Sequence, residues 1–317
     1  MSIIAYSLSD NLNQKLAELE KLRRDIHVAP ISKSGLLEMQ WSAKITRIQN
    51  ALLLDSFSAT TSEISKVLLT AKYKSAKEEK IAGNNKASDY IRQEWYVSGK
   101  KITFDVIVKL NRCINDSKNN ASSIVSKRQF KEPFNQLLDY LNVGNDHPVI
   151  QAGICYFQIM NNDLAIESKK VVATNHAYVV LYNHGYDYRE LLDIEYELAH
   201  DVDGHDFALQ TSQGYNNITT WLEYFIDKLI HQSNRILKSL DSQTKYVDTK
   251  TSIYGLNTRQ RNIMYLFDDP KSRITNRQVQ KKFGISQITA SRDLAKLTSL
   301  GALISYGKGR STWYGKI

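Results

Sequence analysis

Four side chains near the carboxyl end of the chain have the types and the spacing that could read a nucleic-acid duplex. Gln287, Thr289, Ser291 and Arg292 lie within six residues of one another, at the start of a segment with helical periodicity. Gln and Arg can bond base edges bidentately, and Ser and Thr hydroxyls can bond bases or phosphates. Together with Lys296, they predict a recognition helix.

The charge around these residues favours the same partner. Residues 256–317 hold 12 Lys and Arg against 3 Asp and Glu, an excess that equals the formal net charge of +9 for all 317 residues. A basic module joined to a neutral body is typical of proteins that bind polyanions. The alternatives are a solvated basic surface and a module that contacts other proteins or dimerises.

The elements predicted around these residues form a helix–turn–helix. A first amphipathic helix covers 256–267. Thr275 and Gln278 give a capping-box pattern for the second helix, and Gly284 suits its end. Ser286 then caps the third, recognition helix. Its predicted apolar face consists of Ile288, Leu294, Leu297 and Leu300.

Two short strand-like runs, 302–307 and 311–317, follow the recognition helix. Lys308 and Arg310 lie between them, where they would form the tip of a hairpin. Helix, helix–turn–helix and basic hairpin follow one another in the order of a winged helix, a small α+β domain. In this geometry the recognition helix enters the major groove, and the hairpin contacts the neighbouring backbone or minor groove.

The rest of the chain is predicted to be helical. Apolar residues recur at helical spacing from about 32 to 240, and strand signals are scarce, so the fold class is mainly α. We expect an N-terminal helical region at 1–100, a helical core at 101–245 and a winged helix at 256–317, with a linker near 245–255. No apolar run reaches 18 residues, which predicts no membrane span.

Other features of the chain are weaker candidates for chemistry. The run from His200 to Asp206 has the His and Asp density of a metal site, but Asp and Gly also serve as helix caps and turns. We therefore expect a structural role there and no metal. His176 and the tyrosines at 178, 182, 186 and 188 fit packing better than catalysis. Two cysteines, Cys113 and Cys155, indicate buried free thiols in a cytoplasmic protein.

Several runs of the body resemble the Fic (Fido) family of AMP-transferring proteins, in the family's order and spacing. The matching runs are DSFSATTSEI at 55–64, KITFDVIVKLNRCI at 101–114, FKEPFNQLLDYLN at 130–142, HPVIQAGICYFQ at 147–158, VLYNHGYDYRELLDIE at 180–195, WLEYFIDKL at 221–229 and SYGKGRSTWY at 305–314. The resemblance covers most of the chain and implies an all-helical Fic-like domain followed by a winged helix.

The resemblance also implies that the catalytic loop, HPFxxGNGRxxR in the family, is degenerate here. Counting from both flanks places Asp163 where the family has its general base. Glu167 stands where the metal-binding acid is usual. The remaining motif positions, two glycines, an Asn and two arginines, are occupied by Ser168, Lys170, Lys169, Val171 and Thr174.

The family's inhibitory helix is altered as well. Its pattern of Ser or Thr, Glu and Gly or Asn falls on Ala51, Asp55 and Ser56, so only a shorter carboxylate remains, at Asp55. Lys169 and Lys170 could attract an anion, or could simply be solvated.

We therefore expect a DNA-binding protein, a transcriptional regulator built on an inactive Fic-like domain. Double-stranded DNA is the expected partner, a homodimer is possible, and no cofactor is expected. One alternative is a divergent AMP- or nucleotidyl-transferase that would need ATP and Mg²⁺. The other is a protein-interaction module.

Overall fold

In a computed structural model of the chain, the structure describes residues 5–70, 73–96, 98–115, 127–162, 166–248, 256–267, 272–299, 303–307, 309 and 312–316. Three of the candidate site residues, Asp163, Lys308 and Arg310, lie outside these ranges. The chain divides into two compact units, Met1–Asp241 and Ser242–Ile317. The expected boundaries at 100 and 245 stay predictions.

The first unit is built from helices. They are α1 (Asp10–Val28), α2 (Lys33–Leu54), α3 (Thr61–Thr70), α4 (Ala76–Trp95), α5 (Phe104–Asn115), α6 (Lys127–Val143), α7 (Pro148–Met160), α8 (Lys169–Asn183), the 3₁₀ turn η1 (Tyr188–Glu190), α9 (Ile194–Ala199), α10 (Val202–Gly214) and α11 (Thr219–Asp248), which runs on into the second unit.

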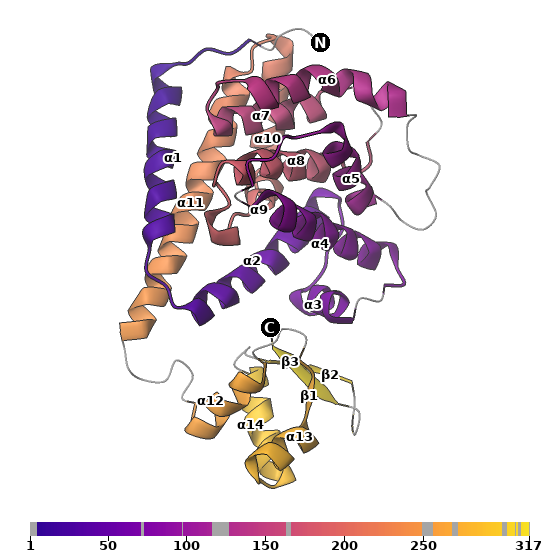
Figure 1. The fold of residues 1–317 in the computed structure, drawn as a ribbon, viewed down its shortest axis with the longest axis vertical. Helices are drawn as coiled ribbons and strands as arrows, with labels where there is room; N and C mark the ends of the chain where they lie inside the picture. Colours follow the sequence, from indigo (N-terminus) through magenta and orange to yellow (C-terminus); the bar gives the residue numbers. More distant parts are fainter. Residues whose placement is uncertain are drawn as a thin grey trace. The chain divides into compact units, whose positions relative to one another are not determined.

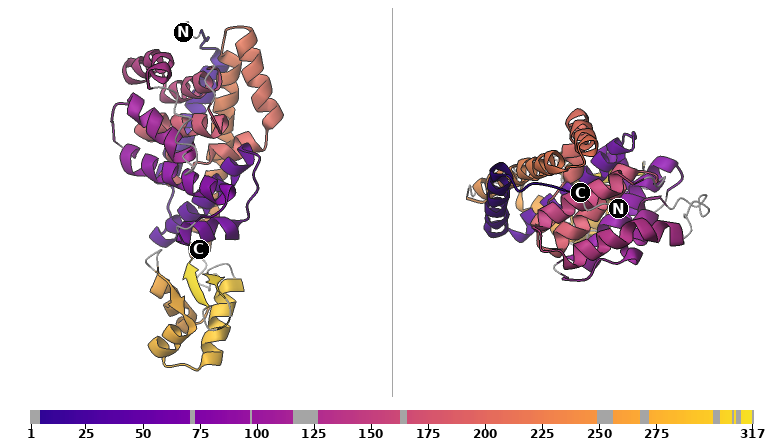
Figure 2. Two further views of the ribbon diagram at one scale, coloured as in Figure 1. Left: turned by 90° about the vertical axis from the view of Figure 1, so that its right-hand side faces the viewer. Right: turned by 90° about the horizontal axis from the view of Figure 1, so that it is seen from above.

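The centre of this unit is the pair α7 and α8, and nearly every described side chain of both helices is buried. Neighbouring segments cover these two helices on every side, so they bury polar residues such as Gln151 and His176 as well as apolar ones. Pro148 occupies the first turn of α7, and the His147 side chain accepts a hydrogen bond from the Val149 N–H. At one edge α1 runs alongside α11 (Figures 1 and 2), where Lys15 and Asp227 form an ion pair of 2.7 Å.

The expected helical character of this unit is confirmed. In α4, small or polar residues such as Gly83 and Asn84 fill part of the buried face, so its apolar pattern is weak. Cys113 and Cys155 are free, with Cys155 buried and Cys113 half-buried. Within the described residues, every helix is too short or too polar to cross a bilayer.

The second unit contains α12 (Thr258–Met264), η2 (Tyr265–Phe267), β1 (Ile274–Thr275), α13 (Asn276–Phe283), α14 (Gln287–Ser299), β2 (Leu303–Tyr306) and β3 (Trp313–Lys316). Its three strands form an antiparallel sheet in the order β1-β3-β2. Strand β1 was not predicted, because it is only two residues long and too short to show an alternating pattern.

The helix signals in this unit are confirmed in detail. Thr275 and Gln278 form both hydrogen bonds of a capping box, and Gly284 ends α13 in the left-handed conformation at φ 62°. A small core of Ile263, Phe267, Val279, Leu294 and Leu297 joins the helices.

The prediction for Ile288 is wrong, because its side chain is 65% exposed instead of lying on the apolar face of α14. At about 100° per residue, six residues place Ile288 roughly 120° around the helix from Leu294. Leu300 lies outside the described residues, and Ala290 occupies the buried face instead.

Candidate functional site

Helix α14 presents two faces of different chemistry. Ala290, Asp293, Leu294 and Leu297 are buried against the rest of the unit. The other face is exposed and carries polar and basic side chains. Its exposed residues are Gln287, Ile288, Ser291, Arg292, Ala295 and Lys296. The structure therefore brings four of the predicted recognition residues, Gln287, Ser291, Arg292 and Lys296, onto one accessible surface.

The single acidic residue of α14, Asp293, points inward. Its carboxylate accepts a hydrogen bond of 2.6 Å from Arg259 Nε and another of 2.7 Å from Gln260 Nε2. Burial alone would raise the pKa of Asp293, but these bonds outweigh it and hold the pKa below its ordinary value. The bonds fasten α14 to α12 and leave no carboxylate on the exposed face of α14.

Two further contacts set the start of α14. The Ser286 hydroxyl accepts from the Thr289 N–H and lies 3.0 Å from the Thr289 hydroxyl, so Thr289 serves the cap and is half-buried. On α13, Asn276 Nδ2 donates to Ser291 Oγ over 2.8 Å. These contacts hold the exposed residues of α14 on a fixed support.

In the first unit, the loop before α8 contains a left-handed backbone conformation at a residue that is not glycine. Ser168 has φ 52° and ψ 41°, the left-handed conformation that glycine adopts most readily. Val171 and Thr174, the positions at which the sequence resemblance placed the family's arginines, are fully buried. No charged side chain can be offered to a phosphate from either position.

The two lysines at the start of α8 are half-buried, and both have partners within the protein. Lys169 Nζ donates to the Asn162 carbonyl over 2.5 Å, and Lys170 Nζ lies 3.1 Å from Asp206 Oδ1. Asp206 also bonds the buried His205 ring at 2.7 Å. Both ammonium groups therefore tie the start of α8 to neighbouring segments.

A lysine that the sequence did not single out connects the loop before α8 to Asp55. Lys80 Nζ, on α4, lies 2.8 Å from Glu167 Oε1, 2.5 Å from Ser168 Oγ and 3.6 Å from Asp55 Oδ2. Asn115 Nδ2 donates to the Glu167 carbonyl over 2.8 Å. We call this group of Asp55, Lys80, Asn115, Glu167 and Ser168 the Lys80 cluster.

The members of the Lys80 cluster differ in their exposure. The side chains of Asp55 and Lys80 are 8% and 13% exposed, whereas that of Glu167 is 58% exposed. Burial raises the pKa of Asp55, and the bonds from Ser168 and Lys80 oppose this rise only in part. Lys80 therefore neutralises the buried carboxylate of Asp55, whereas its ion pair with Glu167 is exposed to solvent.

Replacing Lys80 with Met is expected to destabilise the first unit by about 2–3 kcal/mol, because the Asp55 carboxylate then stays buried without a cation. The matched variant Glu167→Gln is expected to cost less than about 1 kcal/mol, since an exposed ion pair contributes little. Urea denaturation of both variants measures the difference. Equal losses in the two variants would show that the exposed pair, and not Asp55, carries the stability.

The other candidates from the sequence have structural roles. Asp201 caps α10 by accepting a hydrogen bond of 3.2 Å from the Gly204 N–H. The ring of His200 stacks on Tyr196. Burial lowers the pKa of His176 to about 4, and its Nδ1 bonds the Val172 carbonyl. In the part of the chain that the structure describes, no group of His, Cys, Asp or Glu is arranged to hold a metal.

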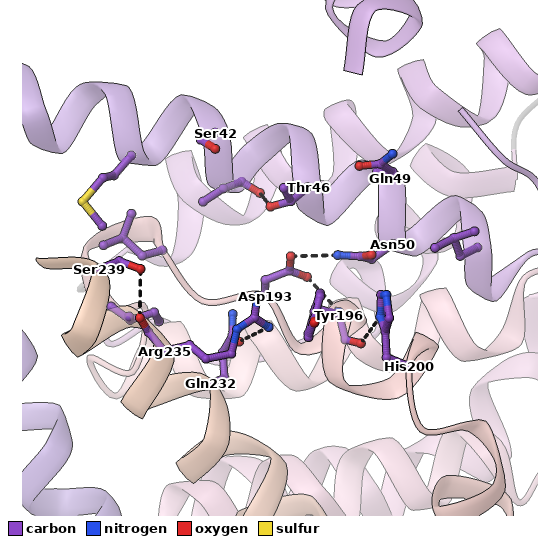
Figure 3. A pocket seen from close by; sticks show the side chains of 15 residues that line it. Ser42, Thr46, Gln49, Asn50, Asp193, Tyr196, His200, Gln232, Arg235 and Ser239 are labelled. Carbon is purple, nitrogen blue, oxygen red and sulfur yellow. Dashed lines mark hydrogen bonds between the residues drawn. The ribbon is translucent and has the colours of Figure 1, made fainter. Parts of the chain in front are cut away.

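A pocket of about 490 Å³ between α2, α9 and α11 was not foreseen (Figure 3). Its polar wall includes Asn50, Asp193, Gln232 and Arg235. These groups are largely paired with one another or with neighbours: Asn50 Nδ2 donates to Asp193 Oδ2 over 3.0 Å, and Arg235 Nη1 donates to Gln232 Oε1 over 3.2 Å. Its residues come from three distant segments, so no local motif marks the pocket.

Beside this pocket lies a buried ionic group. Arg47 Nε is 3.7 Å from Glu195 Oε2, and the guanidinium lies over the Tyr178 ring at 4.0 Å. Burial, and then the neighbouring Glu195 charge, raise the pKa of Asp193 to about 7. The group joins α2, α8 and α9 and sits in the interior, where it stabilises packing.

The fold is similar to that of solved structures. A Fic family protein from Desulfovibrio desulfuricans G20 matches with a TM-score of 0.59 at 11% identity, over 99% of this chain and 98% of that chain. A Fic domain containing signaling protein from Bacteroides thetaiotaomicron VPI-5482 matches with a TM-score of 0.50 at 16% identity, over 74% of this chain and 99% of that one.

No family model and no curated protein sequence matches the chain. At such low identities the structural likeness establishes the fold: a mainly helical Fic-like fold with a small three-stranded antiparallel sheet among helices at its carboxyl end. A shared fold does not establish an activity.

Proposed function

We propose that this protein binds double-stranded DNA through residues 256–317 and acts as a transcriptional regulator. The observation that carries the proposal is the exposed face of α14, where Arg292 and Lys296 stand beside Gln287 and Ser291 while Asp293 is turned inward. Cationic and amide side chains on an accessible helix suit phosphates and base edges.

The support around α14 fits this role. Gly284 and the cap at Ser286 form the turn between α13 and α14, as a helix–turn–helix requires. The sequence of the whole segment is strongly basic, which favours association with a polyanion.

In this proposal the Fic-like unit is a scaffold, a dimerisation surface or a sensor, and it is catalytically inactive. The buried Val171 and Thr174 and the Lys80 cluster support that role, because none of them offers a free cation to a nucleotide phosphate.

The test uses the full-length protein and a duplex selected from a random pool. Arg292→Ala is expected to weaken binding to the selected duplex by about 5- to 150-fold, the range for a bidentate contact with guanine. Arg92→Ala removes the same charge from α4, where Arg92 is half-exposed, and is expected to change affinity less than twofold. Fluorescence anisotropy measures both.

Two outcomes would overturn the proposal. One is that no duplex binds at 50 mM salt. The other is that Arg292→Ala and Arg92→Ala bind the selected duplex equally well. Either result would leave the basic module as a surface for protein contacts.

A further inference from the structure

One residue on the exposed face of α14 has no polar chemistry. Ile288, the second residue of the helix, is 65% exposed. It is spaced three, four and seven residues from Ser291, Arg292 and Ala295, which are exposed on the same side. An isoleucine therefore stands at the amino-terminal end of the face that carries the polar and basic residues.

Packing within the second unit does not explain why an isoleucine occupies position 288. The core of the second unit uses Val279, Ala290, Leu294 and Leu297, and Ile288 is neither in it nor against it. Among the described residues of 242–317, Ile288 is the one large apolar side chain that is exposed. A single exposed apolar residue is ordinary on a protein surface. The inference therefore depends on the position of Ile288 beside Gln287 and Arg292, which are also exposed.

The surroundings indicate what could cover Ile288. Arg292 and Lys296 favour an anionic partner, and the inward turn of Asp293 removes the repulsion that a carboxylate would add. In the major groove of DNA, the 5-methyl of thymine is the apolar group that a side chain can contact. Gln287 is adjacent to Ile288, and Gln can bond the N6 and N7 edge of adenine, the partner of thymine.

We propose that Ile288 is a specificity-determining residue that contacts the 5-methyl group of a thymine in the bound duplex. The proposal rests on the proposed DNA binding and deepens it, since it names the base that one residue selects. Gln287 and Arg292 then supply polar contacts beside an apolar one, so that a T·A pair is distinguished by its methyl group as well as by its hydrogen bonds.

The experiment removes the methyl group and nothing else. Each thymine of the selected duplex is replaced in turn by deoxyuridine, and full-length protein is titrated against each duplex. For the unaltered protein, one replacement is expected to weaken binding by about fourfold, the factor for one methyl group withdrawn from water. For Ile288→Ala, the thymine and deoxyuridine duplexes are expected to bind equally.

Two controls distinguish the loss of a thymine contact from a general loss of folding or binding. Leu53→Ala truncates an exposed apolar side chain of the first unit, 43% exposed, and is expected to keep the fourfold thymine preference. Ile288→Ala is expected to leave the thermal midpoint unchanged, because the side chain is outside the core.

The outcomes separate the two proposals. If the unaltered protein binds no duplex, DNA binding fails and this inference fails with it. If duplexes bind but no thymine shows a methyl preference, or if Ile288→Ala retains that preference, only this inference is overturned. If Ile288→Ala dissociates a dimer and lowers affinity for thymine and deoxyuridine duplexes alike, Ile288 contacts a second copy of the chain instead.

Discussion

Replacing Arg47 with Met is expected to destabilise the Fic-like unit by about 3–5 kcal/mol, the usual cost of leaving a buried charge without its partner. Arg47 is 8% exposed. In the described part of the chain it is the cation within ion-pair distance of Glu195, and its guanidinium also covers the Tyr178 ring. The substitution keeps apolar volume but removes the charge that holds α2 against α8 and α9.

The loss is expected to depend on pH. Burial raises the folded-state pKa of Asp193 to about 7, above the usual unfolded value of about 4. A raised carboxyl pKa contributes stability that is complete below about pH 4 and is lost as the pH rises through 7. Without Arg47, the pKa values of Asp193 and Glu195 rise further, so Arg47→Met costs more at pH 8 than at pH 5.5.

Urea denaturation followed by circular dichroism at the two pH values measures this effect. Asp193→Asn, combined with Arg47→Met, is expected to restore part of the stability at pH 8, since it removes one of the stranded carboxylates. Arg92→Met serves as the control, because Arg92 is half-exposed. A loss below about 1 kcal/mol for Arg47→Met, or an equal loss at both pH values, would contradict this account of the buried group.

Local signals in the sequence were sufficient to predict many of the helices. The helix α7, from Pro148 to Met160, lies in the region where apolar residues at helical spacing predicted helices. Thr275, Gln278 and Gly284 located both ends of α13. Caps and apolar periodicity act over a few residues, so a single sequence contains them completely.

Features that depend on packing between distant segments were missed. Lys80 was not singled out, because its partners Asp55 and Glu167 are 25 or more positions away and nothing near Lys80 marks it. Ile288 was assigned to the core by its apolar character alone, although its angle around α14 places it outside. The pocket beside Asp193 draws its wall from three separate helices.

The fold that the resemblance to the Fic family predicted is the fold of the chain. Similar folds appear among solved structures at 11% and 16% identity, which shows that the helical framework tolerates extensive substitution. A catalytic loop tolerates far less, since each of its side chains must meet a reacting atom. The burial of Val171 and Thr174 is therefore more informative about function than the overall match.

Duplex binding by the full-length protein is expected to fall about 10³-fold between 50 and 200 mM salt. Each neutralised phosphate contributes about 0.9 to the logarithmic salt slope, so five or six contacts give a slope of roughly −5. The excess of nine positive charges in residues 256–317 is enough to supply these contacts. Anisotropy titrations at four salt concentrations give the slope directly.

Variants at the hairpin separate contacts with phosphates from contacts with bases. Lys308→Ala and Arg310→Ala are each expected to weaken all duplexes equally and to make the slope shallower by about one, because a phosphate contact carries no sequence information. Lys100→Ala, in the first unit and 54% exposed, is expected to leave the slope unchanged. If the slope is near zero, or if Lys100→Ala changes it as much as Arg310→Ala does, the basic segment does not form the phosphate-binding surface that DNA recognition requires.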